Sequence, residues 1–431
     1  MESTVWILVV SFVLLLAMNV PIAVCIAVST VLTMLFTVAF LPAVTTVAQQ
    51  MATGINVFSL LAIPFFILSG LLMGQGGIAR RLIEFAKALV GMLPGGLAYV
   101  NVMACMFFGA LSGSSVAATS AIGGFMLPVM EKEGYDRNFN AALTITASTT
   151  GLLIPPSNIL IVYSLASGGV SIAALFIAGY LPGILVGIGL MMVAAVYSVV
   201  RKYPVGERVP LADALRRILH ALPSLLLVVI VIGGIIVGIF TATEASAIAV
   251  LYALFLSVVC YREIKLRQIP GILLKAVEIT AIVMLLIGAS KGMSWILSYE
   301  NIPQGITEYL VGLTDSRVMI LLLINLILLA VGTFMDMTPA VLIFTPIFLP
   351  IATQLGIDPI HFGMIMVLNL CIGLCTPPVG SVLFVGCGIA NTTIAALMKP
   401  LMFLYVAMVA ALLLVTYIPA ISLTLPRFFG Y

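Results

Sequence analysis

Two proline pairs, at positions 155–156 and 377–378, each interrupt a long apolar stretch of the chain. Proline has no backbone N–H and disfavours helical geometry in the residue before it, so each pair leaves carbonyl oxygens without helical partners. At membrane depth such carbonyls are tolerated where they line a polar cavity. Together with hydroxyls, they are hard oxygen donors that suit an alkali cation. The residues expected to form a binding site around the breaks are Gly151, Pro155, Pro156, Ser157 and Asn158, and Gly373, Thr376, Pro377, Pro378 and Gly380.

A short polar segment lies upstream of each break and separates two half-length apolar limbs. Each limb is too short to cross a bilayer comfortably, because a span needs about 20 apolar residues. Such a pair of limbs predicts a re-entrant hairpin whose polar tip lies near the break. The tip residues are Ser112, Gly113, Ser114 and Ser115 in the first hairpin, and Thr333, Asp336 and Thr338 in the second. The candidate ligands for an alkali cation are Ser114, Ser115, Asn158, Asp336 and Thr376.

Three charged residues fall within the apolar spans. Asp336 is favoured as a cation ligand, because an ionisable group at membrane depth is a functional candidate by default. Lys291 has two interpretations: it attracts a carboxylate substrate, or its long stem reaches the interface and pairs with Glu300. Glu244 follows a turn and begins a helix, where a carboxylate stabilises the helix dipole, so this role is favoured over that of a ligand.

The sequence lacks the residue patterns expected of an enzyme or a metal centre. Its two histidines, His220 and His361, are predicted at membrane edges on opposite faces, and no GxSxG or HExxH motif occurs. Cys371 and Cys375 have helical i,i+4 spacing, but no His, Asp or Glu lies close enough in sequence to complete a zinc site. The glycine-rich run 91–96 has no P-loop Lys-Ser/Thr after it, which argues against direct use of ATP. No cofactor and no nucleic acid partner is expected.

The two breaks belong to a repeat with an offset of 222 residues. The segment Gly151–Pro156 recurs at Gly373–Pro378, and the same offset, without a gap, matches eight identical residues. The identities outside the breaks are Leu127 with Leu349, Pro128 with Pro350, Gly134 with Gly356, and Asp136 with Asp358. A simpler interpretation is that the prolines only kink packed helices. Two breaks in register, each with its own polar hairpin, instead indicate a secondary transporter with a substrate site near the membrane midplane.

The composition places almost the whole chain in a lipid bilayer. Of 431 residues, 63% are hydrophobic and 8% are charged, and the mean hydropathy is +1.30. A soluble protein of this length needs more polar surface than this charge supplies. Apolar stretches long enough to span a membrane recur along the sequence. The expected fold is therefore an all-α polytopic membrane protein with two inverted-topology repeats, each with a re-entrant hairpin and a broken helix.

The first repeat is expected over residues 1–200 with its hairpin at about 97–130, a link over 201–222, and the second repeat over 223–431 with its hairpin at about 318–352. The other predicted helices are 4–18, 21–40, 57–74, the broken 138–168 and 172–199, and then 223–240, 243–260, 277–298, the broken 360–388 and 394–420. Two basic amphipathic segments, 76–94 and 261–275, are expected to lie at the membrane surface.

The basic residues predict the orientation of the chain. Five crossings per repeat is an odd number, so the second repeat must enter the membrane upside down. With the N-terminus outside, 15 of the 18 Lys and Arg residues lie inside, Arg317 and Arg427 lie outside, and Lys291 lies within a span. The positive-inside rule therefore predicts a cytoplasmic location for Arg80 and for Arg208 in the link, and a periplasmic location for both termini.

The hairpins and breaks resemble those of the large membrane subunit of tripartite ATP-independent periplasmic (TRAP) transporters. The resemblance covers essentially the whole chain and rests on paired motifs. These motifs are Ser112–Ser115, Gly134–Asp136, Ile154–Ser157, Ile239–Thr241 with Glu244-Ala245, Gly356–Pro359 and Thr376–Gly380.

The resemblance implies an elevator-type carrier of the bacterial inner membrane, coupled to a sodium gradient and supplied by a soluble periplasmic substrate-binding protein. It implies one sodium site between the tip Ser112–Ser115 and the break Gly151–Asn158, and a second between Thr333–Thr338 and Gly373–Gly380. Family substrates are mostly small carboxylates, including C4-dicarboxylates and sialic acids. A small membrane subunit of about four helices is also implied. Because no such segment precedes Met1 or follows Tyr431, this subunit is expected to be a separate polypeptide.

In this interpretation, the two hairpins and two broken helices move as one unit past a frame made of the remaining spans. A self-sufficient ion-coupled anion permease with the same inverted plan is the alternative, and a neighbouring gene for a periplasmic binding protein would distinguish the two. An intramembrane enzyme would need a convergent acid/base set that the sequence lacks. A non-transporting scaffold does not explain two matched helix breaks.

Overall fold

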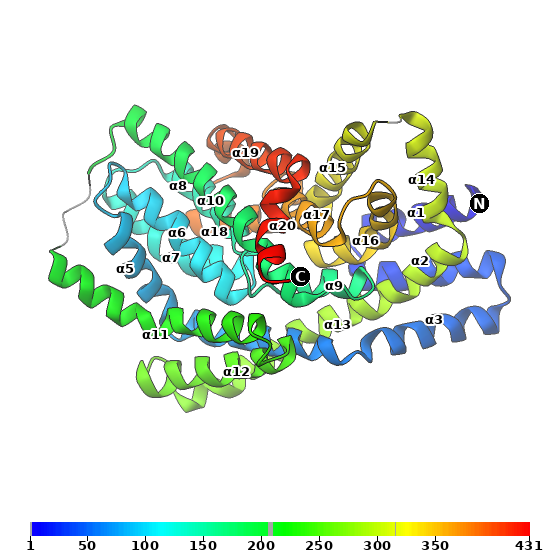
Figure 1. The fold of residues 1–431 in the computed structure, drawn as a ribbon, viewed down its shortest axis with the longest axis horizontal. Helices are drawn as coiled ribbons and strands as arrows, with labels where there is room; N and C mark the ends of the chain where they lie inside the picture. The colour runs from blue at the N-terminus through cyan, green and yellow to red at the C-terminus, as the bar shows by residue number, and fades with distance from the viewer. Residues whose placement is uncertain (1, 206–209, 315) are drawn as a thin grey trace.

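A computed structural model describes residues 2–205, 210–314 and 316–431 of the chain. Within these residues the regular structure is helical, apart from one isolated bridge between Pro94 and Val205. The helices form an elongated molecule with the N-terminus at one end and the C-terminus near the centre (Figure 1). Eight helices in the described part of the chain are long and apolar enough to cross a membrane. The expected all-α polytopic membrane fold is therefore confirmed.

The first half of the chain contains α1 (Glu2–Ala17), α2 (Ile22–Thr37), α3 (Phe40–Ile55), a 3-10 turn (Phe58–Leu61), α4 (Ala62–Gln75), α5 (Ile78–Val90), α6 (Gly96–Ser112), α7 (Ser115–Lys132), α8 (Arg137–Thr150), α9 (Asn158–Ala166) and α10 (Ile172–Arg201). The second half contains α11 (Leu211–Ile236), α12 (Ala242–Leu254) with a π-helical turn (Phe255–Cys260), a 3-10 turn (Leu266–Gln268), α13 (Ile269–Tyr299), α14 (Ile302–Leu313), α15 (Arg317–Phe334), α16 (Met337–Gln354), α17 (Pro359–Gly373), α18 (Ser381–Ala390), α19 (Ile394–Tyr417) and α20 (Pro419–Phe428).

The helices of the two halves follow the same 222-residue offset as the sequence motifs. The second hairpin limbs, α7 and α16, begin at Ser115 and Met337. The helices that follow the breaks and their loops, α10 and α19, begin at Ile172 and Ile394. Each pair of starting residues differs by 222. The hairpin α6–α7 and the broken helix α8–α9 therefore have α15–α16 and α17–α18 as their counterparts, which confirms two repeats of one plan.

Three helices were not predicted from the sequence. They are α3, in which Thr and Gln residues interrupt the apolar positions, α14, which follows Asn301 in a left-handed conformation (φ 53°), and α20, which follows the last predicted span. By the repeat offset, α14 is the counterpart of the amphipathic α5. The segment 261–275, predicted to lie at the membrane surface, contains a corner, a 3-10 turn and the first turns of the continuous helix α13.

The hairpin tips are tighter than predicted. The first hairpin has Gly113 and Ser114 between its limbs, and the second has Met335 and Asp336. The predicted tip residues Thr333 and Thr338 therefore lie in the last turn of α15 and the first turn of α16. Helices reach closer to each tip because Ser114 and Asp336 occupy N-cap positions, which favour Ser and Asp.

The helices form two packed groups, which can be followed in Figure 1. The first group, termed the frame, comprises α1–α5 and α11–α14. Within it α4 packs on α12, and α13 packs on α2 and α3, while α5 packs both on α11 of the frame and on α6 of the second group. The second group, termed the core unit, comprises α6–α10 and α15–α20. The spans α10 and α19 were expected in the frame, but they pack against the broken helices α8 and α17. The core unit is therefore larger than the two hairpins and two broken helices.

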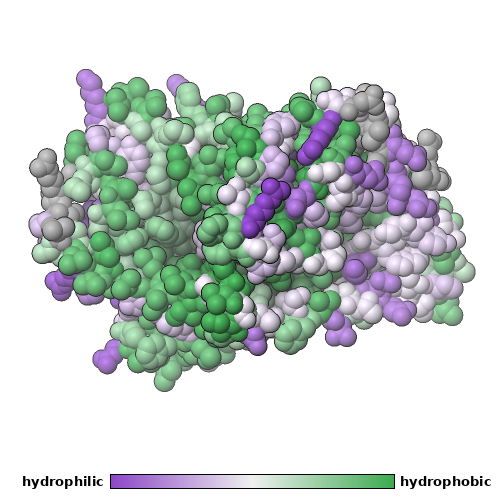
Figure 2. Space-filling view, in the orientation of Figure 1, coloured by the Kyte–Doolittle hydropathy of each residue, from purple (hydrophilic) through white to green (hydrophobic). Residues whose placement is uncertain are grey.

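Apolar side chains cover much of the outer surface, as the face in Figure 2 shows. Exposed valines such as Val196 on α10, Val229 on α11 and Val277 on α13 are typical of side chains that face lipid. Because few charges interrupt these surfaces, they can be covered by hydrocarbon without the cost of burying ions. Arg208, which the positive-inside rule placed in the cytoplasmic link, lies outside the described residues.

Candidate cation and substrate site

The tip of the first hairpin is a one-glycine turn followed by a capped helix. Gly113 ends α6 in the left-handed conformation (φ 61°), which glycine adopts without steric cost. Ser114 is the N-cap of α7, and its Oγ accepts a hydrogen bond from the N–H of Ala117 at 3.3 Å. Ser112 Oγ donates to the Ser114 carbonyl at 3.3 Å. The tip hydroxyls are thus partly engaged in building the turn.

The first break follows the end of α8. The peptide bond between Pro155 and Pro156 is cis, and α9 begins at Asn158. Ser157 is fully buried, and its Oγ donates to the Leu152 carbonyl at 2.5 Å. This bond satisfies one carbonyl that the interrupted helix leaves without an N–H partner. The predicted break is therefore present, with α8 ending and α9 starting within the core unit.

The first tip and the first break are in direct contact. A Cβ atom built on Gly113 would lie 3.0 Å from Asn158 Nδ2, and one built on Gly151 would lie 2.3 Å from the Cα of Gly109. Glycine at these positions allows the hairpin backbone to approach the break. Among the described residues, Asn158 Oδ1 is buried without a hydrogen-bond donor. A buried oxygen atom that receives no hydrogen bond is suited to coordinate a cation.

The second tip and the second break are joined by hydrogen bonds. The Thr333 carbonyl accepts from the N–H groups of Val379 at 3.1 Å and of Gly380 at 3.4 Å. Ser381 Oγ, at the start of α18, donates to Asp336 Oδ1 at 3.4 Å. A Cβ on Gly373 would lie 2.5 Å from the backbone of Gly332, so this pair repeats the close approach seen between Gly151 and Gly109. Both repeats therefore bring the predicted tip to the predicted break.

Other predicted residues contribute less directly. Thr376 Oγ1 donates back to the Ile372 carbonyl at 2.7 Å, as in a helix end. Ser115 is buried in the first turn of α7, and Thr338 is half-buried in the first turn of α16. The peptide bond between Pro377 and Pro378 is cis, like that of the first break. Ser381 was not predicted, although its position directly after Gly380 at the start of a half-helix is a signal that the sequence carries.

Side-chain amides fasten each hairpin to its broken helix. In the first repeat, Asn101 of α6 donates to Thr144 Oγ1 of α8 at 2.8 Å. In the second, Asn369 of α17 donates to Asn325 Oδ1 of α15, also at 2.8 Å. All four residues are buried. These asparagines were not predicted, but an amide within an apolar span is itself a signal, because burial of an unpaired amide is costly.

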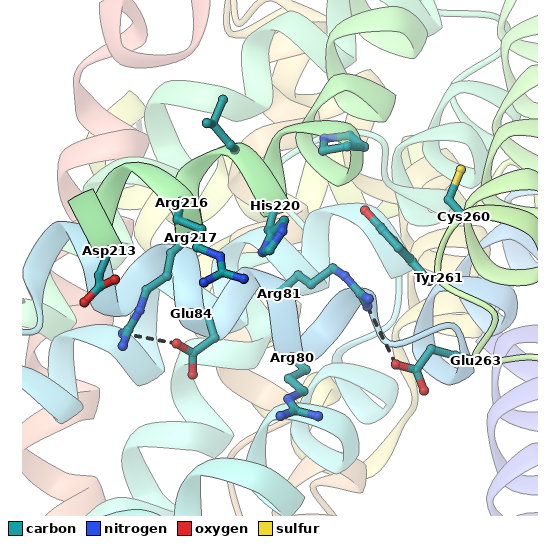
Figure 3. Close-up of a pocket in the computed structure, with 12 residues that line it drawn as sticks. Arg80, Arg81, Glu84, Asp213, Arg216, Arg217, His220, Cys260, Tyr261 and Glu263 are labelled. Carbon is teal, nitrogen blue, oxygen red and sulfur yellow. Dashed lines mark ion pairs between the residues drawn. The ribbon is translucent and has the colours of Figure 1, made fainter. Parts of the chain in front are cut away.

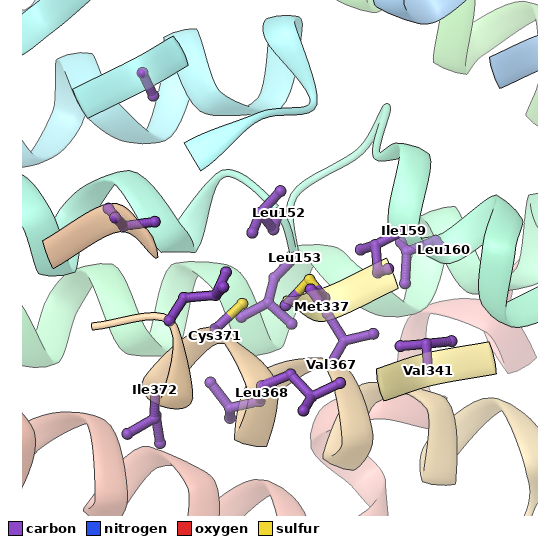
Figure 4. Packing of buried hydrophobic residues seen from close by; sticks show 14 of the residues in the cluster. Leu152, Leu153, Ile159, Leu160, Met337, Val341, Val367, Leu368, Cys371 and Ile372 are labelled. Carbon is purple, nitrogen blue, oxygen red and sulfur yellow. The ribbon is translucent and has the colours of Figure 1, made fainter. Parts of the chain in front are cut away.

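The two broken helices contact each other in the centre of the core unit. Cys371 Sγ donates to the Thr149 carbonyl at 3.4 Å, and these two residues are 222 positions apart. When equivalent positions of two copies touch, the symmetry axis that relates the copies passes between them. Figure 4 shows buried apolar side chains of the first break, α9, α16 and α17 around Cys371. The axis of the two inverted repeats therefore passes through the core between the breaks.

The two breaks differ in exposure. Pro156 and Ser157 are buried, whereas their counterparts Pro378 and Val379 are exposed, and 45% of Val379 is accessible. The Asp336 side chain is exposed beside them. Asp336, Pro378 and Val379 are thus accessible from outside the chain, whereas Pro156 and Ser157 are enclosed and the first tip at Gly113 and Ser114 is half-buried.

Two of the three charged residues weighed from the sequence, Glu244 and Lys291, lie away from the breaks. Glu244 forms a capping box with Thr241, accepting from the Thr241 N–H at 2.8 Å, so its predicted role at a helix start is confirmed. The stem of Lys291 in α13 packs against Gly54 of α3 within the frame. Among the described residues the ion pairs are Arg81–Glu263 and Arg217–Glu84, so Lys291 does not pair with Glu300 there.

Comparison with known proteins agrees with this architecture. The model of the family described as "Tripartite ATP-independent periplasmic transporter, DctM component" matches residues 9–421. The chain is 45% identical to the C4-dicarboxylate TRAP transporter large permease protein DctM of Pseudomonas aeruginosa, covering 86% of this chain and 87% of that protein. It is 40% identical to the sialic acid TRAP transporter large permease protein SiaM of Vibrio cholerae, covering 89% and 90%.

Two further matches extend the comparison. The chain is 41% identical to the isethionate TRAP transporter permease protein DctMQ of Oleidesulfovibrio alaskensis, covering 97% of this chain and 65% of that protein. The fold resembles the crystal structure of the YdaH transporter of Alcanivorax borkumensis, with a TM-score of 0.60, 14% identity and coverage of 90% of each chain. The family match spans almost the entire chain, and both helix breaks lie within it. The chain therefore belongs to the large permease family of TRAP transporters.

Proposed function

We propose that this chain imports a small organic acid by sodium symport, as the large membrane subunit of a tripartite transporter. The observation that carries the proposal is the pair of tip–break contacts, one in each inverted repeat. Each contact joins hydroxyl, amide or carboxylate oxygens to a helix whose backbone is interrupted. Such discontinuous helices hold substrate and coupling ions in secondary transporters.

The oxygen atoms at the two contacts support sodium as the coupling ion. In the first repeat, Asn158, whose Oδ1 is buried without a hydrogen-bond partner among the described residues, lies next to Gly113, and Ser112 and Ser114 flank this glycine at the tip. In the second, the Asp336 carboxylate lies beside Thr333 and the N-terminus of α18. A carboxylate in one site and neutral oxygens in the other would give the two sites different affinities for a monovalent cation.

An anionic substrate is supported by the half-helices that follow the breaks. Both α9 and α18 begin directly after a break, and a helix N-terminus carries partial positive charge that attracts anions. The relatives named above for C4-dicarboxylate, sialic acid and isethionate share organic acids as substrates. We favour a C4-dicarboxylate or a sialic acid-like carboxylate for this chain.

An elevator-type movement is supported by the division into frame and core unit. Both hairpins, both broken helices, α10 and α19 belong to one packed group. The amphipathic helices α5 and α14 lie at the points where the chain passes from the frame into the hairpins. The core unit would carry the bound substrate past the frame while α5 and α14 brace the frame at the membrane surface.

The remaining parts of the proposal concern partners and orientation. A periplasmic binding protein would deliver the substrate, and a small four-helix membrane subunit would enlarge the frame. Both termini would face the periplasm, because this orientation places 15 of the 18 basic residues in the cytoplasm.

Uptake in proteoliposomes tests the proposal. The chain is reconstituted with its small subunit, and the cognate binding protein is added outside with labelled carboxylates. We expect uptake that needs both the binding protein and an inward sodium gradient. Uptake without the binding protein would support the self-sufficient permease instead. Uptake of equal rate with potassium in place of sodium would contradict sodium coupling.

A further inference from the structure

A basic cleft lies in the frame, among residues that the proposed transport mechanism does not use. The cleft of about 800 Å³ is bounded by α5, by the first turns of α11 and by the corner that follows α12. Figure 3 shows basic side chains from α5 and α11 on both sides of the space between these helices. Four arginines and a histidine line it, against three carboxylates: Arg80, Arg81, Arg216, Arg217 and His220, with Glu84, Asp213 and Glu263.

Two of the arginines hold the walls together. Arg81 stacks over the Tyr261 ring at 3.5 Å, donates to the Gly77 carbonyl at 2.9 Å, and lies 3.9 Å from Glu263. Arg217 Nη1 lies 3.1 Å from Glu84 Oε2 and links α11 to α5. These contacts join α5 to the other two walls.

The wall after α12 is also attached to α11. Tyr261 Oη and Ser224 Oγ are 2.9 Å apart, and Tyr252 Oη donates to the Pro223 carbonyl at 2.9 Å. The three walls are therefore joined pairwise before any ligand binds. A cleft with fixed walls binds its ligand without a large ordering cost.

The other two arginines have no acidic partner. Within the described residues, neither Arg80 nor Arg216 forms an ion pair, and both side chains are exposed. A guanidinium presents several donors in a planar fork that matches the oxygens of a phosphate group. Donors from Arg80 and Arg216 thus remain free for an anion.

An apolar surface extends from the cleft along α11. Leu215, Leu219, Leu222 and Leu226 recur at helical spacing and are 43–56% exposed. Leu219 also lines the cleft, so the apolar stripe runs beside the basic cleft and continues beyond it to Leu226. The cleft lies at the start of a helix long enough to span the membrane, which places the arginines at the level of lipid headgroups. A ligand suited to both surfaces has an anionic head and an apolar tail.

We propose that this cleft binds the phosphate-bearing headgroup of an anionic phospholipid, with an acyl chain along the leucine stripe of α11. The site lies entirely in the frame. A bound lipid would fasten α5 to α11 and to the bilayer, and so would stabilise the frame against which the core unit moves. This inference needs only that the protein lies in a membrane, and not that the transported substrate or coupling ion is the proposed one.

Lipid retention measured by native mass spectrometry tests the proposal. The full chain is purified from detergent and incubated with phosphatidylglycerol, with phosphatidylcholine of the same chain length, or with glycerol phosphate and inorganic phosphate. We expect preferential binding of phosphatidylglycerol. The double variant Arg80→Gln/Arg216→Gln should bind it at least fivefold more weakly, because each basic residue near a lipid headgroup is worth about 1 kcal/mol, or about fivefold. Arg267→Gln, an exposed arginine outside the cleft, is the matched control.

Four results of the lipid-binding measurements would overturn the proposal. They are unchanged phosphatidylglycerol binding in the double variant, an equal loss in Arg267→Gln, equal binding of phosphatidylcholine, and equally tight binding of inorganic phosphate, which would assign the cleft to a soluble anion. Loss of the small membrane subunit from the double variant, with lipid binding intact, would also overturn it and would identify a protein-docking surface. Circular dichroism and gel filtration of each variant verify that it is folded.

Discussion

Asp336 places a carboxylate between the second hairpin tip and the start of α18, 3.4 Å from Ser381 Oγ. We predict that Asp336→Asn weakens the sodium dependence of uptake by at least tenfold while the protein remains folded. A unit charge 4 Å from the ion is worth about 4 kcal/mol at an effective dielectric of about 20, and part of this is offset by desolvation of the carboxylate. The measurement is the initial rate of uptake as a function of sodium concentration.

Glu308→Gln in α14 removes the same charge at an exposed position of the frame and serves as the control. If Asp336→Asn and Glu308→Gln both retain the sodium affinity of the parent protein, Asp336 is not a sodium ligand. A melting temperature that falls sharply in Asp336→Asn alone would instead indicate a structural role.

Ser114 has a structural role as well as a candidate ligand role. Its side chain caps α7, so we expect Ser114→Ala to destabilise the protein by about 0.5–2 kcal/mol, and Ser114→Gly by only a few tenths. Both variants lose the hydroxyl, so a loss of sodium affinity that comes from a ligand should be equal in the two. Thermal unfolding and sodium titration on the same preparations separate the two roles. Equal stability of Ser114→Ala and Ser114→Gly would contradict the capping role.

At the scale of elements, each hairpin meets its broken helix through a glycine. A Cβ on Gly151 would lie 2.3 Å from the Gly109 Cα, where only backbone is available to move. We predict that Gly151→Ala destabilises the core unit by about 1–3 kcal/mol, the usual cost of overpacking, or more. Gly124→Ala in α7 is the matched control, because its Cβ would have no neighbour within 4 Å. Thermal unfolding in detergent compares Gly151→Ala with Gly124→Ala. Equal melting temperatures would show that the hairpin and the break move apart at little cost in free energy.

The frame also meets a hairpin through a glycine. A Cβ on Gly70 of α4 would lie 2.6 Å from the Ser112 carbonyl at the first tip. If the core unit slides along the frame, Gly70→Val should obstruct this position of the tip and reduce uptake strongly, while docking of the binding protein is preserved. Gly233→Val in α11, which has no neighbour within 4 Å, should leave uptake near that of the parent protein. Equal uptake by the two variants would argue against movement of the tip past α4.

The elements that the sequence predicted well are those with a strong local signal. Proline pairs and glycines specify the breaks, because no tertiary contact can restore the missing N–H groups. By contrast, α3 and α14 were missed because amphipathic helices lack the continuous apolarity of a span. The placement of α10 and α19 with the broken helices depends on packing between segments distant in sequence, which periodicity does not reveal.

The sequence likewise predicted some features of the candidate site and missed others. The tip and break residues were identified because they repeat at one offset, and the structure brings them together. The orphaned Asn158 Oδ1 and the bond from Ser381 to Asp336 required coordinates, because they depend on side-chain direction. Asn101 and Asn369 could have been found from the sequence, because each is a polar residue in an otherwise apolar span. The overall composition does not reveal such single residues.

At the scale of the whole molecule, the orientation in the membrane is testable. We expect cysteines introduced at Arg80 and Lys202 to be labelled from the cytoplasmic side, and one at Arg427 from the periplasmic side, because the basic residues then follow the positive-inside rule. Membrane-impermeant maleimide on intact cells, and again after permeabilisation, gives the measurement. The native cysteine Cys260 is exposed and must be replaced first. Labelling of position 202 in intact cells would reverse the orientation.

The unequal exposure of the two breaks has a consequence for the transport cycle. In this structure Val379 is accessible and its counterpart Ser157 is enclosed. If the core unit moves as proposed, two copies of one plan inserted in opposite senses would exchange conformations, and each would take the one that its twin now has. This exchange would close the second break, open the first, and turn the accessible side of the molecule to the opposite face of the membrane. The difference between the two halves would then describe the opposite end state of the proposed carrier.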